Sequence, residues 1–487
     1  TTGEFKGNEQ KSEMRAAYFY NDLTHHGRAG FLWQKLRDPR SYDYKKISTK
    51  GYDERLRMPK FPFNEEEIEA ISTFVLGLVA DPPAKEYLYR PEGAAKARIE
   101  GERMIDRYNC TGCHMLQLPK VEYAVDPKEL AATAITPSDH PAGVELLLKL
   151  KPPEKGETGR TQQVKTDQGM KELPVIAFHG LIYSRPEADA APDEREFTYD
   201  LWSTLDVGGK KILPQARMLV TASRLVPGAT AKDGYITPPR GGTFAEWLVE
   251  SLIKQGQARS MAWQMSPPPL YKEGLKVQTP WLYQFLRDPY RLRHTTVLRM
   301  PRFNMSAEEA QTLANYFAAV DDEQFPYQQI PQREPEYLTK KSEQLKKFLA
   351  PKKTSYLAES WRVLNAPLCV KCHSVGGREF KAVDPTKDIR GPNLEYAADR
   401  LRPDWLMVWL YKPAWITPYT SMPQPLPKDA KNFEELFGGD AGVQTIALRD
   451  ALMNYHRLME QEGKAVVENP TPPKAEVSAS ATTRRGE

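Results

Sequence analysis

Hydrophobic and polar residues follow the 3.6-residue period of an amphipathic α-helix in four stretches of the chain. Two stretches begin with a capping-box pattern, in which Asn or Ser is followed three residues later by Glu, at residues 64–67 and 306–309. The other two cover residues 94–108 and 357–364. We expect a helix in each, with an apolar face formed by Ile68, Ile71, Phe74, Val75, Leu313, Tyr316, Phe317, Val320, Ile99, Met104, Ile105, Tyr108, Leu357, Trp361 and Leu364.

A longer pattern of helix and loop occurs three times. Each copy has a Leu after a turn, an amphipathic segment that contains Trp and ends in Pro, a loop, and the dipeptide Met-Pro. The three copies are Leu23, GRAGFLWQKLRDP and Met58; Leu270, GLKVQTPWLYQFLRDP and Met300; and Leu394, RLRPDWLMVWLYKP and Met422. This repetition predicts three related units in one chain.

Residues 115–266 lack the repeat. They contain short runs rich in β-branched and aromatic residues, PVIAFHGLIY and FTYDLW, and a longer one, KKILPQARMLVTASRLV. We expect these runs to form a β-containing insertion in the middle domain. Docking to a partner, shielding of a prosthetic group and simple bulk all remain open as its role.

Length and composition limit the possible classes of protein. A chain of 487 residues is too long for one core, because domains usually have about 100–150 residues. The net charge of +4 does not indicate a nucleic-acid partner. No apolar run of about 18 residues and no secretory signal are present, so we expect any leader or membrane anchor to lie upstream of Thr1.

The cysteines carry the most specific signal. The chain has four, and they form the two motifs Cys110-Thr-Gly-Cys113-His114 and Cys369-Val-Lys-Cys372-His373. Two thiols on one helical turn can form thioethers with the two vinyl groups of one haem, and the adjacent imidazole then binds the iron. Two motifs that use every cysteine therefore predict two covalently attached c-type haems.

Other uses of such cysteine pairs fit less well. A thioredoxin-type redox pair lies in a βαβ context, which the sequence does not show. A zinc site built from both pairs would have four thiolates and no use for the two adjacent histidines.

The order of helix, CxxCH, Gly-Pro-x-Leu loop, helix and Met-Pro loop resembles class I cytochrome c, and the resemblance covers most of the chain outside residues 115–266. It implies a mainly α fold of tandem class I cytochrome c-like helical domains. It also implies that Met422 is the distal ligand of the haem held by His373, and that Met300 is that of the haem held by His114. By the same resemblance, the carbonyl groups of Pro392 and Pro268 accept hydrogen bonds from the two proximal imidazoles.

Other residues also compete for ligand roles. His140 and His179 lie in the insertion and are rival distal ligands for the first haem, although a histidine there is more often simply hydrogen-bonded. Core packing is the alternative for each methionine. Trp281 and Trp405 occupy equivalent repeat positions, and we expect them to pack near the haems rather than to relay electrons.

Met58 belongs to a complete repeat that no CxxCH precedes. Either a third haem motif lies upstream of Thr1, or this domain has lost its haem. We expect the first, because a domain without its haem would lack the group around which its apolar loops pack.

These observations predict five segments. Residues 1–85 form the back half of a cytochrome domain, residues 86–325 a haem domain with the insertion at about 115–266, and residues 326–350 a linker. Residues 351–460 form a C-terminal cytochrome domain and residues 461–487 a disordered tail with almost no large apolar side chains.

His/Met ligation leaves no open coordination position on the iron, which favours one-electron transfer over substrate chemistry. The chain is similar to multihaem cytochrome c subunits that accompany membrane quinol-oxidising complexes of the bc type. The resemblance implies a periplasmic location, or one on the periplasmic face of the inner membrane, and a membrane respiratory complex and other redox proteins as partners. The rival hypothesis is a di-haem peroxidase or dehydrogenase whose haem at Cys110, Cys113 and His114 has no methionine ligand. A haem-based sensor is a third, but no output domain is visible.

Overall fold

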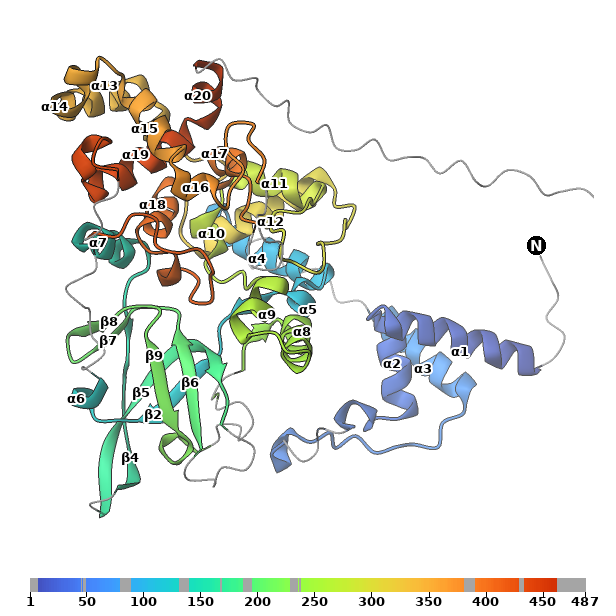
Figure 1. Ribbon diagram of the computed structural model, residues 1–487. Helices are drawn as coiled ribbons and strands as arrows, with labels where there is room; N and C mark the ends of the chain where they lie inside the picture. The colour runs from blue at the N-terminus through green and yellow to red at the C-terminus, as the bar shows by residue number, and fades with distance from the viewer. Residues whose placement is uncertain are drawn as a thin grey trace, which may run out of the picture. The chain divides into compact units, whose positions relative to one another are not determined.

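The computed structural model describes residues 8–44, 46, 50–78, 89–130, 140–166, 169–186, 195–227, 235, 238–380, 390–428 and 433–461. The chain divides into two compact units, residues 1–90 and 91–487 (Figure 1). The predicted tail lies outside the described residues, apart from residue 461.

The described residues of the first unit form the α-helices α1 (Asn8–Thr24), α2 (Arg28–Arg37) and α3 (Glu65–Gly77). The predicted capping box is confirmed, because the Asn64 side chain accepts a hydrogen bond from the backbone N–H of Glu67. Phe19 stacks on Trp33 with ring centres 5.4 Å apart, and both lie in the small core of this unit. Met58 packs against that core, partly buried.

The second unit begins with α4 (Gly93–Arg107), which crosses α12 (Ala307–Val320). The crossing is close, because a Cβ atom added to Gly101 would lie 2.2 Å from the Cβ of Tyr316. The second predicted capping box is also confirmed, since Ser306 accepts a hydrogen bond from the N–H of Glu309. A core around Ile105 joins these helices to α11 (Thr279–Arg287), and α10 (Glu273–Lys276) precedes α11.

The strands all come from the middle of the chain. The largest sheet has five antiparallel strands in the order β2-β5-β6-β9, with β4 also paired to β5. Its members are β2 (Lys120–Ala124), β4 (Glu157–Thr166), β5 (Gly169–Ser184), β6 (Glu196–Leu201) and β9 (Arg217–Thr221). Alternate residues of β6 are buried, so one face of the sheet packs on a separate core that contains Phe178 and Tyr199.

The same part of the chain forms two smaller sheets and several helices. They comprise β3 (Glu154–Lys155), β7 (Leu205–Val207) and β8 (Lys210–Ile212) in one sheet, β1 (Met115–Gln117) and β10 (Arg240–Gly241) in the other, and the helices α6 (Pro127–Leu130), α7 (Pro141–Leu150), α8 (Thr243–Lys254) and α9 (Arg259–Met265).

The expectation of a mainly α fold made of tandem cytochrome c-like helical domains is therefore wrong. About 50% of the described residues are helical and 15% are in strands, in several sheets, which makes the protein a mixed α/β structure. The physical reason is that the sheet between residues 115 and 241 has its own buried core. A segment with its own core is a structural layer of the molecule rather than a loop on a helical domain.

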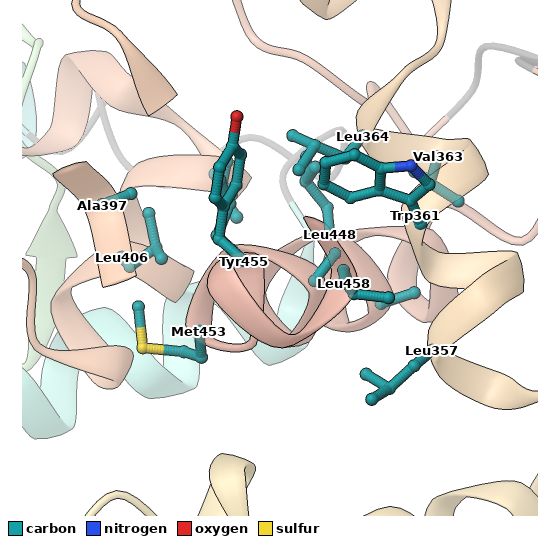
Figure 2. Packing of buried hydrophobic residues seen from close by; sticks show 14 of the residues in the cluster. Leu357, Trp361, Val363, Leu364, Ala397, Leu406, Leu448, Met453, Tyr455 and Leu458 are labelled. Atoms are coloured by element: carbon teal, nitrogen blue, oxygen red, sulfur yellow. The ribbon is translucent and has the colours of Figure 1, made fainter. Parts of the chain in front are cut away.

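The C-terminal part is helical. It contains α15 (Tyr356–Leu364), α16 (Pro367–Val370), α17 (Ala397–Arg400), α18 (Pro403–Tyr411), α19 (Ala441–Met453) and α20 (Tyr455–Gln461). Trp361 and Leu364 of α15 lie beside Leu448 and Leu458 in the core of this part (Figure 2). The segment predicted as a linker contains α13 (Pro335–Gln344) and α14 (Lys346–Leu349), and Leu349 is buried in the same core.

Candidate haem-binding sites

The first CxxCH motif forms one isolated turn of helix. Asn109 has a left-handed backbone conformation (φ 49°), which ends α4 and lets the chain restart as α5 (Cys110–Cys113). The backbone N–H of His114 then donates to the carbonyl of Cys110 at 2.9 Å. Cys110 packs partly buried against the core around Ile105, whereas Cys113 is exposed. The two thiols therefore lie on one short turn directly before the imidazole, the spacing that attachment to one haem requires.

The second motif has the same local geometry. Helix α16 leads directly into it, and the backbone N–H groups of Cys372 and His373 donate to the carbonyl of Cys369 at 3.3 and 3.0 Å. The thiols of Cys369 and Cys372 are both partly buried. Two segments far apart in the sequence therefore adopt one conformation, in which thiol, thiol and imidazole follow each other around a turn.

Each proximal imidazole is held by a proline carbonyl from the following repeat. The Nδ1 of His373 lies 2.7 Å from the carbonyl oxygen of Pro392, and the Nδ1 of His114 lies 2.9 Å from that of Pro268. Both hydrogen bonds were expected from the resemblance to class I cytochrome c. A carbonyl can only accept, so Nδ1 carries the proton in both rings and Nε2 keeps its lone pair. Each imidazole is thus in the tautomer that binds iron through Nε2.

The leucine that follows each of these prolines holds the repeat loop against the CxxCH motif. The N–H of Leu270 donates to the carbonyl of Met115 at 2.8 Å, and the N–H of Leu394 donates to the carbonyl of Ser374 at 3.2 Å. In each case the acceptor is the residue that follows the proximal histidine. This pairing explains why both repeats place Leu two residues after the proline that holds the imidazole.

Glycine is required where the loop meets the second imidazole. A Cβ atom added to Gly391 would lie 2.5 Å from Cε1 and 2.6 Å from Nδ1 of His373. The N–H of Gly391 also donates to the carbonyl of Cys372 at 2.8 Å. The backbone at Gly391 therefore lies directly against the ring and limits its rotation.

Electrostatics favour neutral groups in both motifs. Burial raises the pKa of the thiols of Cys110 and Cys369 to about 11. Burial lowers the pKa of His114 and His373, although the proline carbonyl opposes this in each ring. Thioredoxin-type cysteines and zinc thiolates need a lowered thiol pKa, so this environment does not favour either alternative.

The two candidate distal methionines are both partly buried. Met300 is partly buried and packs against the same core as Cys110 and Trp281. Met422 is also partly buried, and its Sδ accepts a hydrogen bond of 3.0 Å from the indole N–H of Trp409. One lone pair of a thioether can bind iron while the other accepts a hydrogen bond, so this contact is compatible with ligation.

Trp409 was not singled out by the sequence. It stacks on Trp405 with ring centres 5.2 Å apart and an interplanar angle of 11°. The equivalent pair in the other repeat is Trp281 and Phe285, stacked at 5.0 Å. Alignment of the two repeats could have suggested the stacked pair, but not the indole–sulfur bond, because phenylalanine has no donor at that position.

The rival histidine ligands have other partners. His140 is buried, its Nε2 lies 3.1 Å from the carbonyl oxygen of Leu426, and its ring packs against Tyr411. The Nδ1 of His179 lies 2.8 Å from a carboxylate oxygen of Glu154. Hydrogen bonding thus accounts for both histidines.

The donor set of each motif fits a c-type haem, because it offers two thiols and an imidazole whose Nε2 has no hydrogen-bond partner among the described residues. Within the described part of the chain, no group of three or more His, Cys, Asp or Glu side chains could hold a bare metal ion. A haem brings four nitrogen ligands of its own and needs only two axial groups from the protein, so it does not require such a cluster.

Neither the apolar character of the helices nor similarity to known proteins adds an assignment. Among the helices of the described ranges, none has the length and apolar character to cross a membrane. No protein-family model matches the chain, and neither the curated proteins nor the solved structures include a similar protein.

Proposed function

We propose that this protein is a c-type cytochrome with two covalently attached haems, one at Cys110, Cys113 and His114 and one at Cys369, Cys372 and His373. The observation that carries the proposal is the shared geometry of the two motifs. In both, the imidazole donates Nδ1–H to a proline carbonyl of the repeat and keeps Nε2 free. Chance would not place the same acceptor residue opposite both CxxCH histidines.

We infer that Met300 and Met422 are the distal ligands. When bound, the haem supplies reversible one-electron chemistry, and the sulfur opposite the imidazole raises its reduction potential. The chain's own part is to orient each imidazole, to keep the thioether in place and to surround the iron with apolar side chains. Six-coordinate iron leaves no position for a substrate, so the function is electron transfer.

The proposal extends to partners and location. Covalent haem attachment through CxxCH takes place on the outer side of bacterial membranes, which favours the periplasm or the periplasmic face of the inner membrane. We propose that the protein passes single electrons between a membrane respiratory complex, such as one of the bc type, and a second redox protein.

The test is haem stoichiometry with matched variants. Pyridine haemochrome analysis of protein that has been exported and matured should give two haems per chain. The double variant Cys369→Ser/Cys372→Ser should retain one haem, and Cys110→Ser/Cys113→Ser should retain the other. Two haems in both double variants, or none in the intact protein, would contradict the proposal.

Enzyme activity is tested in the same preparations. Negligible turnover of hydrogen peroxide, together with methionine–iron charge-transfer absorption from both haems, is expected of an electron carrier. Rapid peroxide turnover, with a high-spin signal from the first haem, would instead support a di-haem peroxidase. Three haems per chain in protein isolated from its source would mean that Met58 also faces an iron.

A further inference from the structure

The two haem-bearing parts meet through equivalent segments of the repeat. Val277 and Leu401 form an antiparallel bridge. On either side of it, the N–H of Gln278 donates to the carbonyl of Arg400, and the N–H of Arg402 donates to the carbonyl of Lys276, both at 2.8 Å. Because these positions correspond in the two repeats, the junction has approximate two-fold symmetry.

Side chains cross this junction in both directions. The Gln278 amide donates to the carbonyl of Leu401 at 2.7 Å, and Nε of Arg402 donates to the carbonyl of Val277 at 2.9 Å. Each part also sends one cation to a tryptophan of the other. The guanidinium carbon of Arg400 lies 5.1 Å from the centre of the Trp281 ring. The ammonium group of Lys276 lies 6.0 Å from that of Trp405.

The positive charges at this junction are not balanced. Lys276 pairs with Glu273 at 2.8 Å. Within the described residues, Arg293 and Arg400 have no carboxylate partner; Arg293 donates only to the carbonyl of Ser266, at 3.1 Å. Among the described residues, the buried Nε of Arg400 has no hydrogen-bond acceptor. Burial of a charged group without a hydrogen-bond partner is costly, so this arrangement favours a bound anion.

The charges lie beside the first CxxCH motif. Arg293 and Lys276 both act to lower the pKa of His114, and Glu273 acts to raise it. Burial lowers the pKa of Arg400, and the positive charge of Arg293 lowers it further. Trp281, on which Arg400 rests, shares a core with Cys110 and Met300. The positive charges of Arg293, Lys276 and Arg400 exceed the one negative charge of Glu273 by two near the first CxxCH motif.

We propose that Arg400 and Arg293 bind the two propionate carboxylates of the haem attached at Cys110 and Cys113. A residue from the C-terminal haem domain then completes the site of the other haem. The ligand class is a porphyrin dicarboxylate, whose two negative charges equal the excess positive charge of the cluster. Guanidinium groups suit this task, because they stay charged and bind a carboxylate through two parallel hydrogen bonds. This inference rests on the proposed function, since it needs a haem at His114.

The experiment is a spectroelectrochemical titration of the matured two-haem protein and of Arg400→Gln. Loss of a cation beside a haem favours the oxidised iron, which has one more positive charge than the reduced iron. We expect the ratio of reduced to oxidised first haem, at a fixed electrode potential, to fall about tenfold, which is 59 mV for a one-electron couple. Arg400→Lys should restore most of the ratio. Arg287→Gln, which removes an exposed cation from α11, should leave it unchanged.

A second variant shows which of the two measured potentials belongs to which haem. Met422→His should lower the potential of the second haem, so the potential that responds to Arg400→Gln should be the other one. Resonance Raman spectra of the intact protein and of Arg400→Lys give an independent readout, because the propionate bending mode responds to hydrogen bonding without requiring Arg400→Gln to fold.

The outcomes separate the two proposals. Absence of haem from the intact protein would mean that the proposed function fails. Two bound haems with unchanged potentials in Arg400→Gln, or an unchanged propionate mode in Arg400→Lys, would overturn the propionate site. A potential that moves with added inorganic phosphate in the intact protein would also overturn it, because the cluster would then hold a free anion.

Discussion

Replacement of Gly391 by Ala tests whether the repeat loop positions an iron-binding imidazole. The new Cβ would lie 2.5 Å from Cε1 of His373, whereas ordinary contact begins at 3.4 Å. The ring must therefore move by about 0.9 Å, or the loop must withdraw by the same distance. Either movement lengthens the 2.7 Å bond to Pro392 to roughly 3.6 Å, beyond the range of a hydrogen bond.

The expected cost has two parts. Overpacking costs about 1–3 kcal/mol, and loss of the hydrogen bond costs about 1 kcal/mol more. We expect the free energy of unfolding of the C-terminal haem domain to fall by about 2–4 kcal/mol. The potential of the second haem should fall as well, because the displaced imidazole loosens the iron–sulfur bond on the opposite side.

The assay follows the absorption of the second haem during guanidinium denaturation of matured protein. Gly442→Ala is the matched control, because it lies in α19 of the same domain and its added Cβ would meet only a side-chain oxygen of Asp440, at 3.3 Å. The control should stay within about 0.5 kcal/mol of the original protein. A Gly391→Ala protein with unchanged stability and an unchanged spectrum would refute the reasoning.

Three further changes test other contacts. Trp409→Phe removes the hydrogen-bond donor to the sulfur of Met422, which makes the sulfur a stronger ligand for oxidised iron. The reduction potential of the second haem should therefore fall in a redox titration. An unchanged potential would count against that hydrogen bond. Met300→Leu should abolish one of the two methionine–iron charge-transfer bands. Met305→Leu, which changes a methionine of the same core, should keep both bands. Loss of a band in each of these variants would count against Met300 as the ligand. Gly101→Ala places a Cβ 2.2 Å from the Cβ of Tyr316 in α12. The free energy of unfolding should fall by about 1–3 kcal/mol in a denaturation assay. A stability equal to that of the original protein would contradict the close helix crossing.

Local signals in the sequence predicted local structure well. The capping boxes at Asn64 and Ser306 form, because an Asn or Ser with a Glu three residues later satisfies helix N–H groups without distant partners. The carbonyls of Pro268 and Pro392 meet the two imidazoles, as the resemblance to class I cytochrome c implied. These features depend on spacing within a motif or on copies of one motif.

Longer-range features were predicted poorly. The runs of β-branched residues indicated strands, but they did not show that β5 would pair with β2, β4 and β6 in one sheet with its own core. The pairing partner and register of a strand depend on packing across the sheet, which a single run does not encode. The fold class was therefore wrong, although the runs themselves were located.

The junction between the haem-bearing parts was also missed. Val277 and Leu401 are far apart in the chain, and neither position has a distinctive residue. The only signal was their equivalence in the repeat, which permits a two-fold contact without predicting it. That the buried Nε of Arg400 has no acceptor among the described residues becomes visible only when burial and partners are known.

Peptide mass mapping of the matured protein tests the central claim most directly. After proteolysis, the peptides that contain Cys110 with Cys113 and Cys369 with Cys372 should each carry the mass of one haem and contain no free thiol. Unmodified cysteines in both peptides, or zinc recovered in place of iron, would contradict the account.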